Sequence, residues 1–137
     1  EALSLALADG ALDCAVSDHT PVDEDQKQQP FAEAEPGATG LELLLPLVLK
    51  WGEERKLPLV KSLARVTADA ARVLGVASGR IEPGAPGDVI VFDPQAPFRV
   101  TPEALKSQGK NSPFLGHELA GRVRATIVAG NVVFEQM

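Results

Sequence analysis

The sequence of 137 residues has few aromatic side chains and no excess of positive charge. Aromatic residues make up only 4% of the chain. Its 13 lysine and arginine residues stand against 19 aspartate and glutamate residues, which gives a formal net charge of -6. Proteins that bind nucleic acids use a basic surface to contact phosphates and aromatic rings to stack on bases. We therefore expect no nucleic acid partner.

Cysteine and long apolar runs are also scarce. Cys14 is the only cysteine, so no disulfide bond can form within the chain, and its place in an apolar run favours a small buried side chain over a nucleophile. No run approaches the roughly 20 apolar residues of a transmembrane helix, and the first residues do not have the pattern of a secretion signal. The apolar fraction of 45% is typical of a globular protein. We expect a cytoplasmic protein without membrane association.

The pattern of apolar residues divides the chain into two blocks that meet near Leu74 and Gly75. Apolar residues in the first block recur at helical spacing, and Pro46 is expected either to bend its helix or to mark the effective start. Helices are predicted at Glu1–Ala8 with an end at Asp9-Gly10, at Gly40–Glu54 with Thr39 as its cap, at Leu59–Ala64, and at Thr67–Leu74 with Thr67 as its cap and Gly75 as its end.

The second block has the short β-rich runs and turn residues of strands. A first strand is predicted at Val89–Phe92, with a stop at Asp93-Pro94. Val123–Ala129 and Val132–Glu135 are predicted to form a hairpin around Gly130-Asn131, because these two residues tolerate the positive φ angles of a tight turn.

The most informative segment is the apolar run that ends in Asp18-His19 and the turn residues Thr20-Pro21. In a parallel α/β barrel the carboxyl ends of the strands open onto the reaction pocket, so an aspartate just after a buried strand is placed where a metal ion or a proton is handled. The alternative is an ordinary turn that caps the next segment, since aspartate, threonine and proline are common loop residues.

Two groups of residues resemble the dihydroorotases, which belong to the cyclic amidohydrolases. The first group is Asp18-His19-Thr20-Pro21, Pro36-Gly37, Gly40-Leu41-Glu42 and Leu45-Pro46-Leu47. The second is Ser107, Lys110-Asn111-Ser112-Pro113-Phe114, Gly116, Leu119 and Gly121-Arg122-Val123. The resemblance extends over essentially all of the chain, but over only the last third or so of such an enzyme.

This resemblance implies the fold class α/β. Residues 1–74 would be the last strand and helices of a β/α (TIM) barrel, and residues 75–137 would be the C-terminal part of a small β-sandwich. Because a complete barrel needs about 250 residues, we expect a C-terminal fragment that begins within a helix. The sandwich strands would have open edges without the rest of the enzyme, so we expect an oligomer, aggregation, or association with the missing part.

The resemblance also implies a chemistry. A dihydroorotase interconverts carbamoyl aspartate and dihydroorotate, with zinc lowering the pKa of water and polarising the carbonyl group. Asp18 matches the family's aspartate that binds metal and carries the proton between water and the leaving nitrogen. Pro36 and Gly37 match the positions whose main chain contacts the substrate ring, although a turn before a helix explains them equally well.

One position departs from the family. A second histidine, four residues after the aspartate, helps to hold the substrate carboxylate in dihydroorotases, and here that position is Val22. His19 is expected to orient the loop or donate a hydrogen bond to a neighbouring group, and His117 to be a surface or interface residue. The family's other metal ligands are not in this chain, so we predict that the isolated chain binds no zinc and has no hydrolase activity.

Three functions therefore remain open. The first is a zinc dihydroorotase of pyrimidine biosynthesis, which the presence of Asp18 and Pro36-Gly37 favours. The second is a non-catalytic dihydroorotase homologue that associates with aspartate transcarbamoylase, which Val22 favours. A relative of hydantoinases or allantoinases is the third, and it matches the loop less well.

Overall fold

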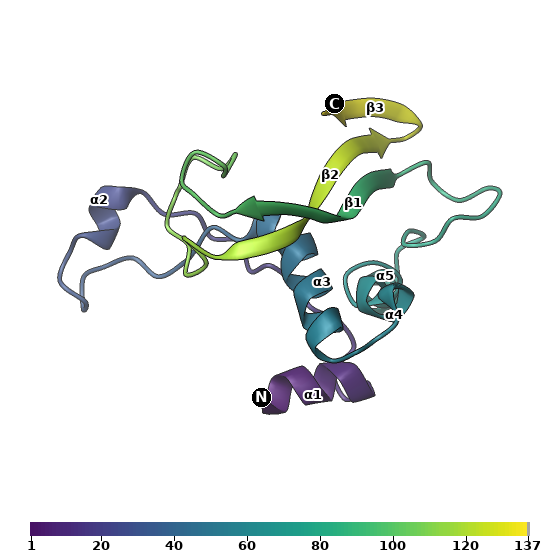
Figure 1. The fold of residues 1–137 in the computed structure, drawn as a ribbon, viewed down its shortest axis with the longest axis horizontal. Coiled ribbons are helices and arrows are strands. Elements are labelled where there is room, and N and C mark those ends of the chain that lie inside the picture. The colour runs from purple at the N-terminus through teal and green to yellow at the C-terminus, as the bar shows by residue number, and fades with distance from the viewer. Residues whose placement is uncertain (137) are drawn as a thin grey trace.

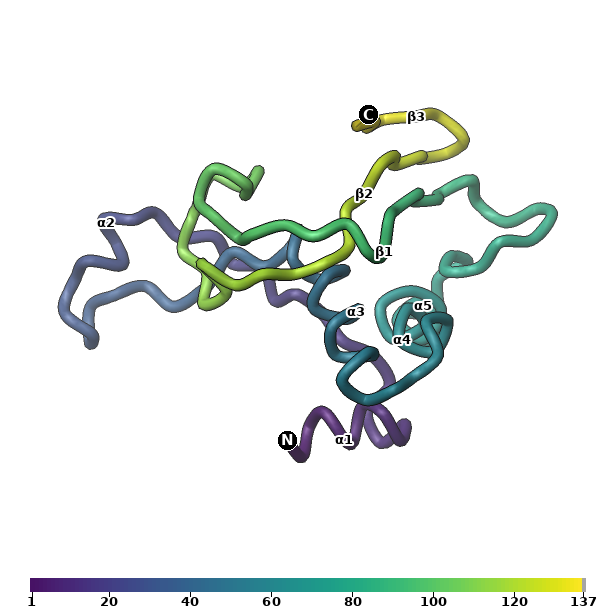
Figure 2. Tube along the Cα trace, in the orientation of Figure 1, coloured from purple at the N-terminus to yellow at the C-terminus, as the bar shows by residue number. Residues whose placement is uncertain are grey.

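The computed structural model describes residues 1–136, so Met137, the last residue of the predicted second block, lies outside the described part. Most helices gather at one end of the molecule, and a three-stranded sheet lies at the other (Figure 1). The loop that carries α2 extends from the body on the side opposite α4 and α5 (Figure 2). The helical elements are α1 (Ala2–Asp9), α2 (Glu24–Lys27), the 3-10 helix η1 (Leu41–Leu43), α3 (Leu44–Glu54), α4 (Leu59–Ala64) and α5 (Ala68–Leu74).

Pro46 marks the start of α3, which is one of the two outcomes that its position predicted. Instead of one helix from Gly40 to Glu54, the chain forms η1 and then α3, with Pro46 in the first turn of α3. Main-chain nitrogens in a first turn have no partner within the helix, so the missing N–H of proline costs little there. The predicted cap at Thr39 is wrong, because its buried hydroxyl donates instead to the main-chain oxygen of Gly109.

The other helix ends follow the sequence closely. Gly10 ends α1 with a φ of 92°, and Gly75 ends α5 with a φ of 68°, both in the left-handed region that glycine adopts without strain. Thr67 lies at the N-cap position of α5, as predicted, but its hydroxyl donates backward to the oxygen of Leu63 at 2.8 Å. It therefore does not cap the helix with its side chain.

The run that leads to Asp18, predicted as the last strand of an intact barrel, forms no strand in the described part of the chain. Residues 13–20 have no regular secondary structure, because a strand needs a neighbouring strand to bond with its main chain. The run is held by α4 and α5 instead. The nitrogen of Ala15 donates to the oxygen of Arg65 at 3.0 Å, and the Arg65 guanidinium donates to the oxygen of Asp13 at 3.3 Å.

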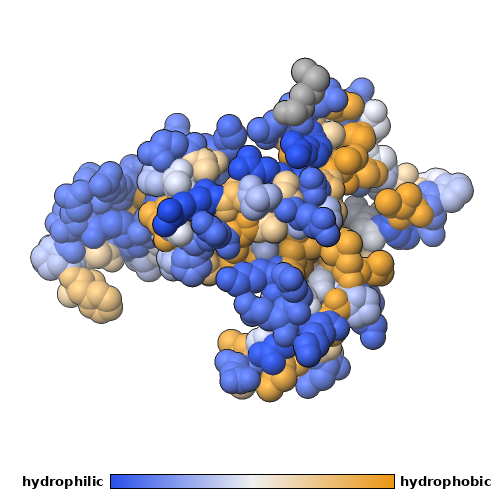
Figure 3. Space-filling view, in the orientation of Figure 1, coloured by the Kyte–Doolittle hydropathy of each residue, from blue (hydrophilic) through white to orange (hydrophobic). Residues whose placement is uncertain are grey.

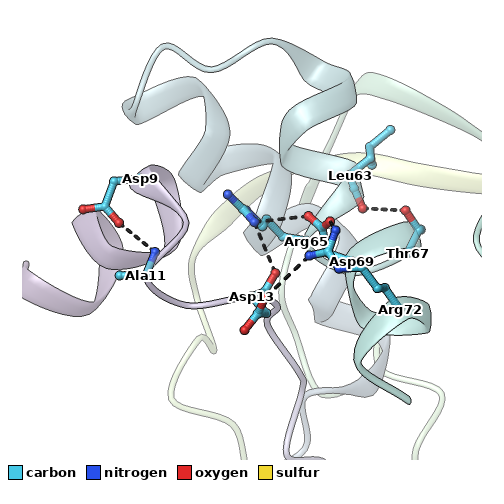
Figure 4. A network of polar contacts seen from close by, with 8 residues as sticks. All are labelled: Asp9, Ala11, Asp13, Leu63, Arg65, Thr67, Asp69 and Arg72. Atoms are coloured by element: carbon cyan, nitrogen blue, oxygen red, sulfur yellow. Dashed lines mark hydrogen bonds and ion pairs between the residues drawn. The ribbon is translucent and has the colours of Figure 1, made fainter. Parts of the chain in front are cut away.

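Ion pairs strengthen this attachment (Figure 4). Asp69 pairs with Arg65 at 3.2 Å and with Arg72 at 3.1 Å, and Arg72 also reaches the Asp13 carboxylate at 3.5 Å. Asp69 is largely buried among these partners, whereas Arg72 and Asp13 are exposed. The network fixes the chain five residues before Asp18.

The sheet is antiparallel, with the strand order β1 (Val89–Arg99), β2 (Glu118–Val128) and β3 (Asn131–Glu135). The predicted stop at Asp93-Pro94 is wrong, because β1 continues to Arg99 after an irregularity. Asp93 pairs with Arg122, and the next pair joins Pro97 to Ala120. The residues between these pairs leave the ladder, so Pro94 is not required to donate a hydrogen bond.

The hairpin between β2 and β3 is present, with its turn one residue earlier than predicted. Val128 pairs with Asn131, so the two turn residues are Ala129 and Gly130, with φ angles of 48° and 78°. Positive φ at both positions is the pattern of a type I′ turn. Apolar side chains cover the outer part of this hairpin (Figure 3), where Val132 and Val133 are each 61% exposed. Among residues 1–136, no helix is long and apolar enough to cross a membrane.

The core joins the start of the helical layer to the C-terminal half of the chain. Its buried members are Leu43, Val100, Leu105 and Leu119, and the side chains packed around them are Leu47, Phe98 and Phe114. Leu43 is 1% exposed and Val100 is fully buried. The loop before α3 therefore rests against the segment around Leu105, and this contact brings the site residues together.

Candidate active site

Asp18 is an exposed residue with a strained main chain. Its φ angle is 45°, in the left-handed region that non-glycine residues rarely adopt. Within residues 1–136, no group donates a hydrogen bond to its carboxylate and no cation pairs with it. Strained main-chain conformations of this kind cost about 1 to 3 kcal/mol and occur preferentially at functional sites. The carboxylate is thus free to act on a ligand.

The turn at Pro36-Gly37 lies against Thr20, two residues after Asp18. The nitrogen of Thr20 donates to the oxygen of Ala38 at 3.0 Å, which holds the two segments together. Gly37 has a φ of 130°, and a Cβ atom there would lie 2.5 Å from the oxygen of Thr20. Only glycine permits so close an approach of two main chains. The structure therefore brings the segments that carry Asp18 and Pro36-Gly37 into contact through Thr20.

His19 caps the start of the next helical segment. Its Nδ1 atom accepts hydrogen bonds from the main-chain nitrogens of Gly40, at 3.2 Å, and Leu41, at 3.1 Å. The sequence predicted that His19 would orient the loop or donate a hydrogen bond. It orients the loop, but as an acceptor, and so it performs the task predicted for Thr39. An acceptor Nδ1 carries no proton, which leaves Nε2 as the protonated nitrogen of the neutral ring.

A third segment, residues 105–112, completes the region from the C-terminal half of the chain. The Asn111 side-chain nitrogen donates to the oxygen of Gly37 at 3.1 Å, and the main-chain oxygen of Asn111 accepts from the nitrogen of Thr39 at 2.7 Å. The sequence placed Asn111 among the residues that resemble dihydroorotases, but gave it no role. Nothing in the spacing indicates that a residue 74 positions further along the chain reaches Gly37.

Glu42 ties this third segment to the start of α3. Its carboxylate accepts hydrogen bonds from the main-chain nitrogens of Lys106, at 2.8 Å, and Ser107, at 3.0 Å, and from the Ser107 hydroxyl at 2.9 Å. Burial raises the pKa of Glu42, but the hydrogen bonds from Ser107 and Lys106 together outweigh burial and hold the pKa below its usual value. Glu42 is therefore a charged anchor, although the sequence predicted no role for it.

Val22 is part of the packed interior. Only 6% of its surface is exposed, and a Cβ atom on Gly109 would lie 3.0 Å from both the nitrogen and the oxygen of Val22. An apolar side chain at this position cannot bind a carboxylate. His117 packs edge-on against Phe114, with a distance of 5.9 Å between ring centroids.

The donor set does not make a complete zinc site. Among residues 1–136, no three or more histidine, cysteine, aspartate or glutamate side chains lie close enough together to hold a metal ion. A catalytic zinc ion normally has three protein ligands, and the predicted residues supply only the carboxylate of Asp18. The described residues therefore do not fit a zinc ion by themselves.

The sequence profile of the amidohydrolase family matches residues 1–134. The chain belongs to the amidohydrolase family. Curated relatives of this amidohydrolase include the dihydroorotase of Geobacter sp. (strain M21) and the dihydroorotase-like protein of Pseudomonas aeruginosa. Each is 42% identical over 98% of this chain and 32% of the relative. This identity confirms the resemblance to dihydroorotases. The chain spans about a third of the length of these relatives.

Solved structures of amidohydrolases share the fold. The L-hydantoinase (dihydropyrimidinase) from Arthrobacter aurescens matches with a TM-score of 0.82 at 30% identity, over 97% of this chain and 31% of that one. The dihydropyrimidinase from Brevibacillus agri matches with a TM-score of 0.90 at 23% identity, over 98% of this chain and 31% of that one. Helices followed by a three-stranded antiparallel sheet therefore form a recurrent part of amidohydrolase chains.

Proposed function

We propose that this chain is the C-terminal part of a dihydroorotase-like zinc hydrolase of the cytoplasm. The reaction would be the interconversion of carbamoyl aspartate and dihydroorotate in pyrimidine biosynthesis. The observation that carries the proposal is the carboxylate of Asp18, which has no partner within residues 1–136 and projects from a strained main chain two residues before the contact of Thr20 with Gly37. The 42% identity to a dihydroorotase supports the choice of this reaction as the first to test. Residues 1–74 would complete a β/α barrel, and residues 75–137 a β-sandwich.

Asp18 carries the proton in this proposal. In the hydrolytic direction its carboxylate accepts a proton from the attacking water and returns it to the ring nitrogen as the carbon–nitrogen bond breaks. The same carboxylate reverses these transfers when the ring closes. Zinc, when bound by the intact protein, would polarise the carbonyl group and activate the water; Asp18 would be one ligand, and the others would come from outside residues 1–136.

Pro36 and Gly37 would contact the substrate ring through their main chain. Pro36 is exposed, and the turn is joined to the Asp18 segment by the hydrogen bond from the nitrogen of Thr20 to the oxygen of Ala38. A substrate ring in contact with this turn would lie close to the segment that carries Asp18. Such positioning is worth a large share of the rate in hydrolysis, because the proton has to be transferred over a short distance.

A specific observation favours a second candidate, a non-catalytic homologue that associates with aspartate transcarbamoylase. Val22 is buried, and it stands at the position where dihydroorotases typically have a histidine. The substrate carboxylate would therefore lose an anchor. A relative with 42% identity is named a dihydroorotase-like protein. The hydantoinases among the solved structures make a hydantoin the third substrate to test.

The test is an assay of the intact protein, purified with zinc, on dihydroorotate, carbamoyl aspartate, hydantoin and allantoin. Conversion of the first two compounds, lost on chelation and restored by zinc, supports the proposal. Turnover of hydantoin or allantoin alone replaces it with the third candidate. An inactive protein that sediments together with aspartate transcarbamoylase establishes the non-catalytic candidate. The isolated residues 1–137 serve as a control that we predict to be inactive with or without zinc.

A further inference from the structure

Asn111 contacts the Gly37 turn through two different groups. Its side-chain amide donates to the oxygen of Gly37, and its main-chain oxygen accepts from the nitrogen of Thr39. The two bonds enclose Ala38, so the turn is held on both sides of that residue. The acceptor at Gly37 is a carbonyl group, which cannot donate, and the facing amide must therefore present its NH2 group.

Asn111 is itself held firmly. The Lys110 ammonium group donates to the main-chain oxygens of Leu105, at 2.8 Å, and Ser107, at 2.6 Å, and so closes the loop before Asn111. Leu105 is anchored in the core with 4% of its surface exposed. Groups that are fixed before a ligand arrives lose less entropy when they bind or orient it. Asn111 therefore acts on the turn from a rigid support.

The same segment also contacts the chain after Asp18. Gly109 is buried against Pro21 and Val22, and a Cβ atom on Gly109 would come within 2.9 Å of Pro21 Cβ. Its main-chain oxygen accepts the hydroxyl of Thr39. Residues 109 and 111 thus touch both parts of the candidate site, and the distance between those parts depends on where this segment lies.

We propose that Asn111 is a positioning residue, which orients the Gly37 peptide for the substrate ring. The inference rests on the proposed function, because it gives Gly37 a ligand to contact. Gly37 needs such support more than other residues would, since glycine has the widest range of main-chain conformations. Without the amide donor, the Gly37 carbonyl would lose its side-chain partner, and the orientation of the peptide would be less restricted. The substrate would then bind less well to a site whose Asp18 carboxylate is unchanged.

The experiment compares the intact wild-type protein with Asn111→Asp and Asn111→Leu. Both substitutions approximate the size of asparagine and remove the donor. Asn131→Asp is the matched control, because it removes the same kind of hydrogen bond, from an asparagine amide to a main-chain oxygen, in the turn between β2 and β3. Two measurements are made on each protein. These are KM and kcat for dihydroorotate, and amide hydrogen exchange of a peptide that spans residues 36–43.

We expect both Asn111 variants to raise KM about 2- to 12-fold, the range for one lost hydrogen bond, with a smaller change in kcat. Exchange in residues 36–43 should accelerate, and Asn131→Asp should leave KM unchanged. If Asn111 had a purely structural role, the variants would contain less active protein, so kcat would fall while KM stayed constant. That result would overturn the inference. Unchanged exchange in both variants overturns it as well. A wild-type protein that is inactive on every substrate refutes the proposed function alone. In that case, faster exchange in the variants still shows that Asn111 holds the turn.

Discussion

The Nδ1 atom of His19 lies 3.1 Å from the main-chain nitrogen of Leu41 and accepts its hydrogen bond. A second hydrogen bond from Gly40 reaches the same atom. The histidine next to the candidate catalytic aspartate is therefore a cap for the following helical segment. Because Asp18 and His19 are adjacent, this cap also fixes the main chain from which the Asp18 carboxylate projects.

Replacing His19 tests this capping role. In the intact protein, His19→Ala should lower the free energy of unfolding by about 1 to 2 kcal/mol, the range for a lost helix cap. The measurement is urea unfolding followed by circular dichroism. His117→Ala is the control, since His117 is exposed, its ring packs edge-on against Phe114, and its main-chain hydrogen bonds remain in the variant. Equal stability of the two variants would contradict the capping role.

Asp18→Asn tests the proton transfer. Asparagine tolerates the left-handed main chain at this position but does not accept a proton from water, so turnover of dihydroorotate by the intact protein should fall by about 100-fold or more. The melting temperature should not change. Asp23→Asn, a substitution of an exposed aspartate five residues further on, should retain normal turnover. Normal turnover by Asp18→Asn would remove Asp18 from the mechanism.

Gly37→Ala tests the close approach of the two site segments. The new Cβ atom would lie 2.5 Å from the oxygen of Thr20 and the φ angle of 130° would also be strained, so we expect a loss of about 2 kcal/mol or more. Gly84→Ala separates the two causes, because Gly84 has a φ of 86° with open space where the Cβ atom would be. Unfolding in urea should therefore show a larger loss for Gly37→Ala. Similar losses would mean that the contact with Thr20 is unimportant.

The lowered pKa of Glu42 predicts a stability that depends on pH. A carboxyl group whose pKa is lowered by folding stabilises the protein fully above its unfolded pKa, which for glutamate is near 4.5. That contribution is lost as the pH falls from there through the lowered value. Urea unfolding from pH 6 downward should show a smaller decline for Glu42→Gln than for the wild type. Glu54→Gln, on an exposed residue of α3, should follow the wild-type curve, and an unchanged curve for Glu42→Gln would argue against the anchor.

The sequence by itself determined the features that depend on a few neighbouring residues. Gly10 and Gly75 end their helices where predicted, because the left-handed conformation is open to glycine whatever surrounds it. Pro46 marks the start of α3, since its missing N–H and fixed φ act within one turn. Short motifs also singled out Asp18, Pro36 and Gly37 as candidate site residues, and their segments are in contact through Thr20.

Only the tertiary structure decided which partners the polar groups chose. Thr39 was predicted to cap a helix, but its hydroxyl bonds to Gly109, 70 residues away, and His19 takes over as the cap. Pro94 was predicted to end a strand, but the pairing of β1 with β2 continues beyond it. In each case a distant group, brought close by the packing of the core, competes with the local interaction and replaces it. The local sequence does not predict such partners, because the distance between the two groups depends on how the segments pack and not on their spacing along the chain.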